Sequence, residues 1–253
     1  MSNKRRLKIA TRPSALAQIQ AQLVIQAITT QHPDISCEIV TIQTAADRDQ
    51  TTAIDQFGGK GIFVKAIDDA ILEGRADIAV HSVKDMSCQT PTPLCLAAVL
   101  TRAPVHDVLI SHNHVNLQDL PRQAIIGTSS TRRACQLQTL RPDLSIRPIR
   151  GNVDTRIGKL GQNYDAIILA YAGLARLKRT TEISTHFSIE DVVPAPAQGA
   201  IGMVCLDTAH DTQALLKPLN HAASYQCVQI ERHIMQQLGS QCFSPVGIHA
   251  QIH

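Results

Sequence analysis

Two adjacent arginines, Arg132 and Arg133, follow a Gly-Thr-Ser-Ser turn in the stretch IGTSSTRRAC, residues 126–135. The glycine permits a tight turn, and Ser129 or Ser130 can cap a helix. The arginines then lie in the first helical turn, where the helix dipole disfavours cations. Free backbone N–H groups together with two guanidinium groups can hold an anion. The motif therefore predicts either an anion site or an exposed basic turn.

Other polar and basic side chains also follow short apolar runs. They are Arg12, Ser14, Ser82, Lys84, Asp85, Thr128 and Arg176, and the stretch RPIRGNVDTR adds Arg150 and Arg156. In open α/β sheets, ligands bind beyond the carboxyl ends of the strands. The repeated pattern therefore predicts a cleft that binds a ligand with several negative charges.

The elements that must position these side chains alternate along the chain. Apolar runs at 7–10, 78–80, 124–126, 166–170 and 201–206 are each followed by a polar turn and a helix-like pattern. A helix is expected from Ala15 to Ile28 after Ser14. The spacing of Phe63, Ile67 and Ile71, followed by Gly74, predicts another. This alternation predicts an α/β fold with largely parallel sheets.

Two boundaries divide the chain, TRAPVH at 101–106 and the proline-containing VVPAPAQGA at 192–200. A chain that crosses twice between two lobes leaves a central cleft. The expected division is a first domain of residues 1–100 and 198–219, a second of residues 105–193, and a small third piece of residues 221–253.

Composition limits the classes of partner. Lys plus Arg number 24 against 21 for Asp plus Glu, and aromatic residues make up 3% with no Trp, so nucleic-acid binding is disfavoured. No run approaches the roughly 20 apolar residues of a membrane span, and no signal peptide is recognised. Seven cysteines without a CxxC pair favour a cytoplasmic protein. His112 and His114 indicate a surface loop, and no metal is expected.

Six stretches and a late cysteine resemble the porphobilinogen deaminase family, also called hydroxymethylbilane synthases. They are RLKIATRPSALAQIQAQLV, GGKGIFVKAI, LEGRADIAVHSVKD, IGTSSTRRACQLQTLRPDLSIRPIRGNVDTR, YDAIILAYAGLARL, PAPAQGAIG and Cys242, in order over residues 7 to 247. The resemblance implies two lobes similar to periplasmic binding proteins and a small α+β third domain. It also implies a dipyrromethane cofactor, built from two substrate molecules and joined by a thioether to a cysteine.

The resemblance gives the basic residues a ligand. Porphobilinogen carries an acetate and a propionate, which planar guanidinium groups can grip in a bidentate fork. The implied cofactor-binding residues are Ser82, Lys84, Thr128, Ser130, Arg132 and Arg133, and Cys242 in GSQCFSPVG is the implied anchor. The residues implied for the substrate and the growing chain are Arg12, Ser14, Gln20, Lys60, Arg150, Arg156 and Arg176.

Asp85, in HSVKD, is the implied catalytic residue. Loss of ammonia from porphobilinogen leaves a positively charged azafulvene, and a carboxylate can accept pyrrole N–H bonds, stabilise that charge and assist proton transfer. A salt bridge to Lys84 or a helix cap is the alternative. The implied activity joins four porphobilinogen units head to tail, and hydrolysis then releases hydroxymethylbilane. A monomer is expected.

The sequence departs from the usual family pattern at Ala46, Gln56, Met86-Ser87 and Ser240-Gln241, and a shortened third domain is expected after the cysteine. The stretch TAADRDQTTAIDQFGGKGIF is interpreted either as a cover for the cleft or as a plain connector. A non-catalytic two-lobed polyanion-binding protein, including a degenerate family member, is the alternative function, and it needs neither Asp85 nor Cys242. A phosphate-ligand enzyme is disfavoured because GxxxxGK[ST], and GxGxxG after a strand, are missing.

Overall fold

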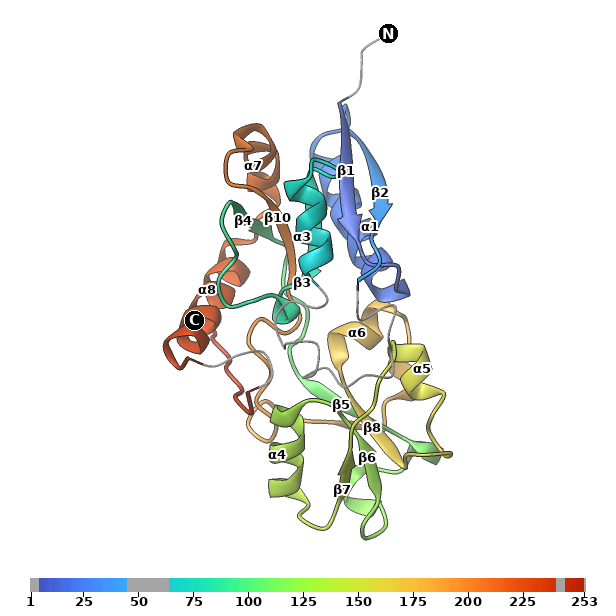
Figure 1. The fold of residues 1–253 in the computed structure, drawn as a ribbon. Helices are drawn as coiled ribbons and strands as arrows, with labels where there is room; N and C mark the ends of the chain where they lie inside the picture. Colours follow the sequence, from blue (N-terminus) through green and yellow to red (C-terminus); the bar gives the residue numbers. More distant parts are fainter. Residues whose placement is uncertain (1–4, 45–63, 240–243, 253) are drawn as a thin grey trace.

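The computed structural model of the chain describes residues 5–44, 64–239 and 244–252. Its strands form two five-stranded sheets, ordered β2-β1-β3-β10-β4 and β7-β6-β8-β5-β9. Each sheet is the centre of one lobe, and the two lobes lie one above the other in Figure 1. The predicted two-lobed α/β fold is confirmed.

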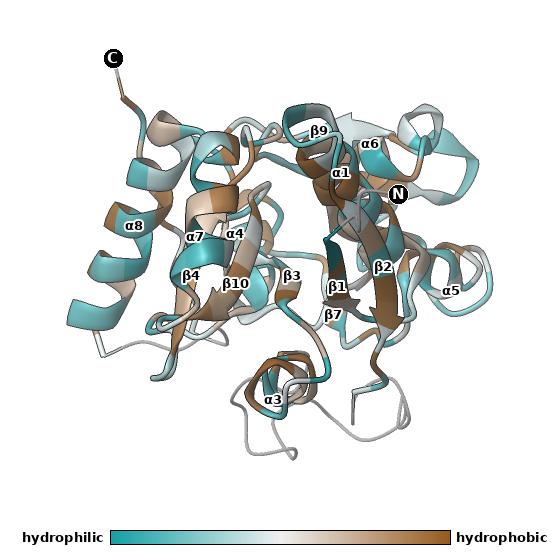
Figure 2. Cartoon of the chain, turned by 90° about the horizontal axis from the view of Figure 1, so that it is seen from above, coloured by the Kyte–Doolittle hydropathy of each residue, from teal (hydrophilic) through white to brown (hydrophobic). Residues whose placement is uncertain are grey.

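The first lobe contains β1 (Arg6–Thr11), β2 (Ser36–Thr41), β3 (Ile78–Ser82), β4 (Leu94–Val99) and β10 (Ile201–Leu206). Its helices α1 (Ala15–Gln31) and α3 (Lys65–Leu72) lie on opposite faces of the sheet (Figure 2). Helix α7 (His210–Leu216) packs against β4 and β10, and its Leu215 and Leu216 belong to the same core cluster as α1. Val24 and Ile28 of α1 are buried on one face, and Ile67 and Ile71 of α3 on the other. Ser14 caps α1, as predicted, because its Oγ accepts a hydrogen bond from Ala17 N at 3.4 Å.

The second lobe contains β5 (Asp107–Ser111), β6 (Ile125–Gly127), β7 (Ser145–Arg147), β8 (Ala166–Ala170) and β9 (Thr185–His186). Helix α4 (Thr131–Leu140) covers one face, and α5 (Val153–Ile157) and α6 (Tyr171–Arg176) cover the other. Short 3-10 turns are η2 (Val83–Asp85), η3 (His112–His114), η4 (Leu117–Asp119), η5 (Thr180–Glu182) and η6 (Lys217–Leu219). His112 and His114 are exposed in η3, as predicted.

The chain passes between the lobes in two crossing segments, residues 100–106 and 193–200. Each crossing segment leads into a strand that runs antiparallel to its neighbours: β5 between β8 and β9, and β10 between β3 and β4. The other pairs, β1 with β2 and β3, and β6 with β7 and β8, are parallel. The carboxyl ends of the parallel strands lead into the loops that carry the predicted site residues.

After the second crossing and β10, the chain forms α8 (Ala222–Gln237), which packs beside β4. Val228 enters the core of the first lobe, and the hydroxyl of Tyr225 donates to Leu96 O at 3.2 Å. Residues 244–252 form neither helix nor strand and return to the second crossing segment, where Ile248 N donates to Pro194 O at 3.0 Å. Within residues 221–239 and 244–252, the structure therefore contains one helix and an irregular segment, without a strand.

Candidate active site

The arginine doublet begins α4, as the sequence predicts. Ser130 caps the helix by accepting a hydrogen bond from Arg133 N at 3.4 Å, and Thr128 Oγ1 accepts one from Ser130 N at 3.1 Å. Both arginine side chains turn into the protein, and Arg132 and Arg133 are only 3% and 7% exposed. This burial excludes the alternative of an exposed basic turn.

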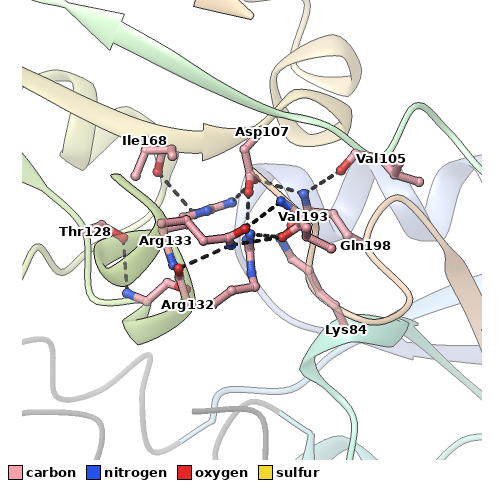
Figure 3. Close-up of polar contacts among 11 residues, drawn as sticks. Lys84, Val105, Asp107, Thr128, Arg132, Arg133, Ile168, Val193 and Gln198 are labelled. Atoms are coloured by element: carbon pink, nitrogen blue, oxygen red, sulfur yellow. Dashed lines mark hydrogen bonds and ion pairs between the residues drawn. The ribbon is translucent and has the colours of Figure 1, made fainter. Parts of the chain in front are cut away.

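Asp107, which sequence reasoning did not single out, lies between the two arginines. It is the first residue of β5, fully buried, and its Oδ2 and Oδ1 accept hydrogen bonds from Nη2 of Arg132 at 2.7 Å and of Arg133 at 2.6 Å (Figure 3). The Nη1 groups donate to Val193 O at 2.6 Å and to Ile168 O at 3.1 Å. Each guanidinium group is therefore fixed by one carboxylate oxygen and one backbone carbonyl.

The two guanidinium groups keep Asp107 ionised. Burial alone would raise the pKa of the Asp107 carboxyl, but the charges of Arg133 and Arg132, and the hydrogen bond from Arg133, together hold that pKa well below its ordinary value. The Nε atoms of Arg132 and Arg133 are buried and have no hydrogen-bond partner among the described residues. Two buried donors thus lack an acceptor among the described residues, although a neutralising carboxylate lies beside them.

Lys84 reaches the same region from the first lobe. It lies in η2, directly after β3, and its Nζ donates to Gln198 Oε1 at 3.3 Å. Burial, followed by the charge of Arg133, lowers the pKa of Lys84 to about 8. Lys84 therefore belongs to one electrostatic group with the arginine doublet, although the two come from different lobes.

Arg156 of α5 lies within electrostatic reach of Asp85 and of three other arginines. Arg156 Nε donates to Gly151 O at 2.8 Å. Burial and the charges of Arg133, Arg150 and Arg12 lower the pKa of Arg156 to about 10, while the charge of Asp85 acts in the opposite direction. Charges from Arg12 and Asp85 of the first lobe and from Arg133 and Arg150 of the second therefore act on Arg156 together.

Other predicted residues have partners within the protein. Gln20 and Ser82 bind each other, with Gln20 Nε2 to Ser82 Oγ at 2.8 Å and Ser82 Oγ to Gln20 Oε1 at 3.2 Å. Arg176 Nη2 donates to Gly199 O at 2.6 Å in the second crossing segment, and burial lowers the pKa of Arg176 to about 10. Arg176 therefore connects α6 to the region between the lobes.

A cavity of about 50 Å³ lies between the lobes and the C-terminal part of the chain. Lys84, Ser130 and Arg132 line it together with Arg232 of α8 and Ser244. Arg232 Nη2 also donates to Ser87 O at 2.8 Å, which fixes the segment after Asp85. The predicted anchor Cys242, Lys60 and the departures at Ala46, Gln56, Ser240 and Gln241 lie outside the described residues.

Within residues 5–44, 64–239 and 244–252, no group of three His, Cys, Asp or Glu side chains could hold a metal ion. Among the same residues, no helix is long and apolar enough to cross a membrane.

Comparison with known proteins shows the family of the chain. The family model described as porphobilinogen deaminase, dipyrromethane cofactor binding domain, matches residues 7–214. Porphobilinogen deaminases from the Langeland and Hall strains of Clostridium botulinum are each 45% identical over 245 residues, which is 96% of this chain and 84% of the relative. A crystal structure of an Actinomyces odontolyticus protein aligns with a TM-score of 0.53 at 13% identity, over 93% of this chain and 96% of that one, and shows likeness of fold alone.

Proposed function

The chain belongs to the porphobilinogen deaminase family, and from this premise we propose that it joins four porphobilinogen molecules head to tail on a dipyrromethane primer. In the proposed reaction, four porphobilinogen molecules and one water give one hydroxymethylbilane and four ammonia molecules. One observation carries the proposal: Asp85 shares a single electrostatic group with Arg12, Arg133, Arg150 and Arg156 between the lobes.

This charge distribution suits the proposed substrate. Every porphobilinogen unit carries two carboxylates, so a growing chain needs several cations, while each ring also presents a pyrrole N–H that needs an acceptor. Arg12, Arg150, Arg156 and Arg176 would bind the carboxylates of the incoming unit and of the growing chain, together with Ser14, Gln20 and Lys60. Asp85 would then be the acceptor for the pyrrole N–H groups.

The residues present also fit the cofactor. The buried Nε donors of Arg132 and Arg133, and the Lys84 ammonium group, form a donor set for carboxylates, and the cavity lined by Lys84, Ser130 and Arg132 has room for a carboxylate-sized group. Ser82 and Thr128 complete the proposed cofactor set. When bound, dipyrromethane supplies the pyrrole carbon to which the first substrate unit is joined.

Cys242 is the proposed attachment point, through a thioether. Ser244 lines the same cavity as Lys84 and Arg132, and two residues of chain span at most about 7 Å. A thiolate is the nucleophile in such an attachment. The bond would form once, so Cys242 would anchor the primer and take no part in turnover.

Asp85 is the proposed catalytic residue. Its carboxylate would accept the pyrrole N–H, stabilise the positive charge that arises when the substrate loses ammonia, and take up the proton that leaves the attacked ring carbon. The arginines would hold the substrate by its carboxylates. This grip would position the reacting carbon of the substrate, so no protein group needs to contact that carbon.

Intact mass under denaturing conditions tests this proposal. Protein produced with porphobilinogen available should carry the added mass of a dipyrromethane, and peptide mapping should place it on Cys242. Cys242→Ser should lack the adduct, and Cys135→Ser, which changes an exposed thiol of α4, should keep it. An adduct that persists in Cys242→Ser would contradict the anchor. A chain that binds the substrate but forms neither adduct nor product would instead be a polyanion-binding protein.

A further inference from the structure

Gln198 occupies the junction of the two lobes, in the second crossing segment, and is 1% exposed. Its side-chain amide is used at both ends (Figure 3). Nε2 donates to Val105 O at 2.6 Å and to Asp107 Oδ1 at 2.9 Å, and Oε1 accepts a hydrogen bond from Lys84 Nζ at 3.3 Å. One amide therefore touches both lobes and the other crossing segment.

The Asp107 carboxylate continues this path to the arginine doublet, because it also accepts hydrogen bonds from Arg132 and Arg133. The connected series is Lys84, Gln198, Asp107 and then the two arginines. Lys84 belongs to the first lobe, whereas Asp107 and the doublet belong to the second. Neither sheet alone can set the distance between the lysine and the doublet, so a residue between the lobes has to do so.

An amide suits this position for an electrostatic reason. Its carbonyl oxygen faces a cation, Lys84, and its NH₂ group faces an anion, Asp107, so both charges are satisfied without adding another. The backbone of Gln198 is held independently, because its N donates to Ala195 O at 2.9 Å and its O accepts from Arg102 Nε at 2.8 Å. A change confined to the side chain therefore leaves the backbone anchors of this residue in place.

We propose that Gln198 is a positioning residue that sets the separation between Lys84 and the arginine doublet, and with it the spacing at which the two lobes offer cations to a carboxylate-bearing ligand. Asp107 serves the same purpose inside the second lobe, where it holds the two guanidinium groups together. The identity of that ligand rests on the proposed function, whereas the spacing itself does not.

Gln136 provides a matched control. It is a partly buried glutamine of α4 in the second lobe, and its side chain binds the second crossing segment. Its Oε1 accepts a hydrogen bond from Val193 N at 2.7 Å, and its Nε2 donates one to Val193 O at 3.2 Å. Gln136 Nε2 also donates to the backbone O of Arg132 at 3.3 Å, but among the described residues Gln136 has no hydrogen bond to Lys84, Gln198 or Asp107. Gln136→Met therefore removes an amide that binds the same crossing segment, and it leaves in place the side-chain hydrogen bonds that join Lys84, Gln198, Asp107 and the two guanidinium groups.

The first measurement reads the position of Lys84 directly. Full-length protein carrying Cys242→Ser, so that nothing is attached at this thiol, is treated with a water-soluble amine-reactive reagent, and labelling of Lys84 is followed by peptide mass. Adding Gln198→Met should speed the labelling by about 10-fold or more, because a hydrogen bond to a charged group is lost. Adding Gln136→Met should change it less than about 2-fold. Unchanged labelling with Gln198→Met, or an equal rise with both, would overturn the proposal.

The second measurement uses cofactor-loaded enzyme and counts only loaded molecules. Gln198→Met should lower kcat on the order of 10-fold, with KM changed much less, because the primer is misplaced and the substrate arginines are untouched. The double variant Lys84→Met/Gln198→Met should be little worse than Lys84→Met alone, since both act on one interaction. Fully additive losses would show a merely structural role and contradict the proposal. If Gln198→Met does not fold, Gln198→Asn, whose shorter amide cannot span both partners, is measured in its place.

These outcomes separate the two proposals. If the proposed function were wrong, no variant would carry the adduct or turn over porphobilinogen, yet Lys84 labelling would still distinguish Gln198→Met from Gln136→Met. If only the positioning role were wrong, the wild-type enzyme would be loaded and active while the labelling of the two variants would be the same.

Discussion

Arg102 and Glu231 form a two-fold hydrogen-bonded ion pair in the interior, with Nη1 to Oε1 at 2.7 Å and Nη2 to Oε2 at 2.9 Å. Arg102 belongs to the first crossing segment and Glu231 to α8. The same carboxylate accepts hydrogen bonds from Ala197 N at 2.6 Å and Ala250 N at 2.8 Å. One buried carboxylate therefore joins both crossing segments, α8 and the irregular segment 244–252.

Removing the charge of Glu231 should destabilise the protein strongly. Glu231→Gln turns an NH₂ group toward donors and leaves the Arg102 guanidinium buried without its anion, so the free energy of unfolding in urea should fall by about 3–5 kcal/mol. The control is Asp69→Asn, which breaks the exposed pair with Lys65 (2.9 Å) and should cost less than about 1 kcal/mol. Similar losses for both variants would mean that the buried pair adds no stability beyond that of a surface contact.

Asp85→Asn should leave the fold and the attached cofactor intact but abolish nearly all turnover. The amide keeps a hydrogen-bond acceptor but has neither the charge that stabilises a pyrrole cation nor the basicity to take up a proton. Circular dichroism, intact mass and the rate of product formation check the three parts separately. Activity within a few-fold of the wild type would show that another group carries the chemistry.

The arginines should separate into two classes by cofactor loading. Arg132→Ala or Arg133→Ala removes a guanidinium group that would donate hydrogen bonds to the carboxylates of the cofactor, and it leaves Asp107 with one guanidinium partner. Because the cofactor is then bound less well, apoprotein with a free Cys242 thiol should accumulate. Arg176→Ala should remain loaded and extend the chain more slowly, because Arg176 binds Gly199 O and does not touch the doublet's carboxylate. Intact mass gives the loaded fraction of each variant. Full loading in both doublet variants would remove Arg132 and Arg133 from the cofactor site.

Lys84 should make cofactor loading depend on pH in a defined direction. Its pKa is lowered to about 8, so the ammonium group that attracts carboxylates is present below that pH and is lost as the pH rises through it. Lys84→Arg stays charged over this range. The measurement is the rate of cofactor loading with porphobilinogen between about pH 6.5 and 9.5, a range chosen around the Lys84 pKa, for wild-type and Lys84→Arg apoprotein. The ratio of the wild-type rate to the Lys84→Arg rate should fall above about pH 8. The ratio also cancels the pH dependence of the thiol. A constant ratio would exclude this role for Lys84.

Gly199→Ala should be far more damaging than a glycine substitution elsewhere. Gly199 has φ +87°, and an added Cβ would lie 2.4 Å from Ala103 O, so the two crossing segments would have to separate. We expect a loss of about 3 kcal/mol or more in the free energy of unfolding. Gly74→Ala is the matched control: its φ is +69°, but nothing lies within 4 Å of its Cβ position, so it should lose only about 1–2 kcal/mol. Equal losses in urea unfolding would rule out the clash as the cause.

The cap by Ser130 and the position of the doublet in the first turn of α4 were predictable because they depend on neighbouring residues. The partner of the doublet was not, since Asp107 is 25 residues away from Arg132 along the chain. An acidic residue that begins the apolar stretch DVLI signals a buried carboxylate that needs a cation, but the signal does not identify the cation. The antiparallel direction of β5 and β10 was likewise hidden, because strand direction depends on the path of the crossing segments.

The order in which the strands leave the ribosome differs between the two lobes. All five strands of the second sheet lie within residues 107–186, one uninterrupted stretch. The first sheet lacks β10, which lies between β3 and β4, until residue 206 has been made. Without β10, β4 has no neighbouring strand in the sheet. The lobe that begins the chain therefore cannot complete its sheet until all strands of the lobe inserted within it have been made. During synthesis, β3 and β4 keep unpaired edges open to wrong pairing until the second lobe is complete.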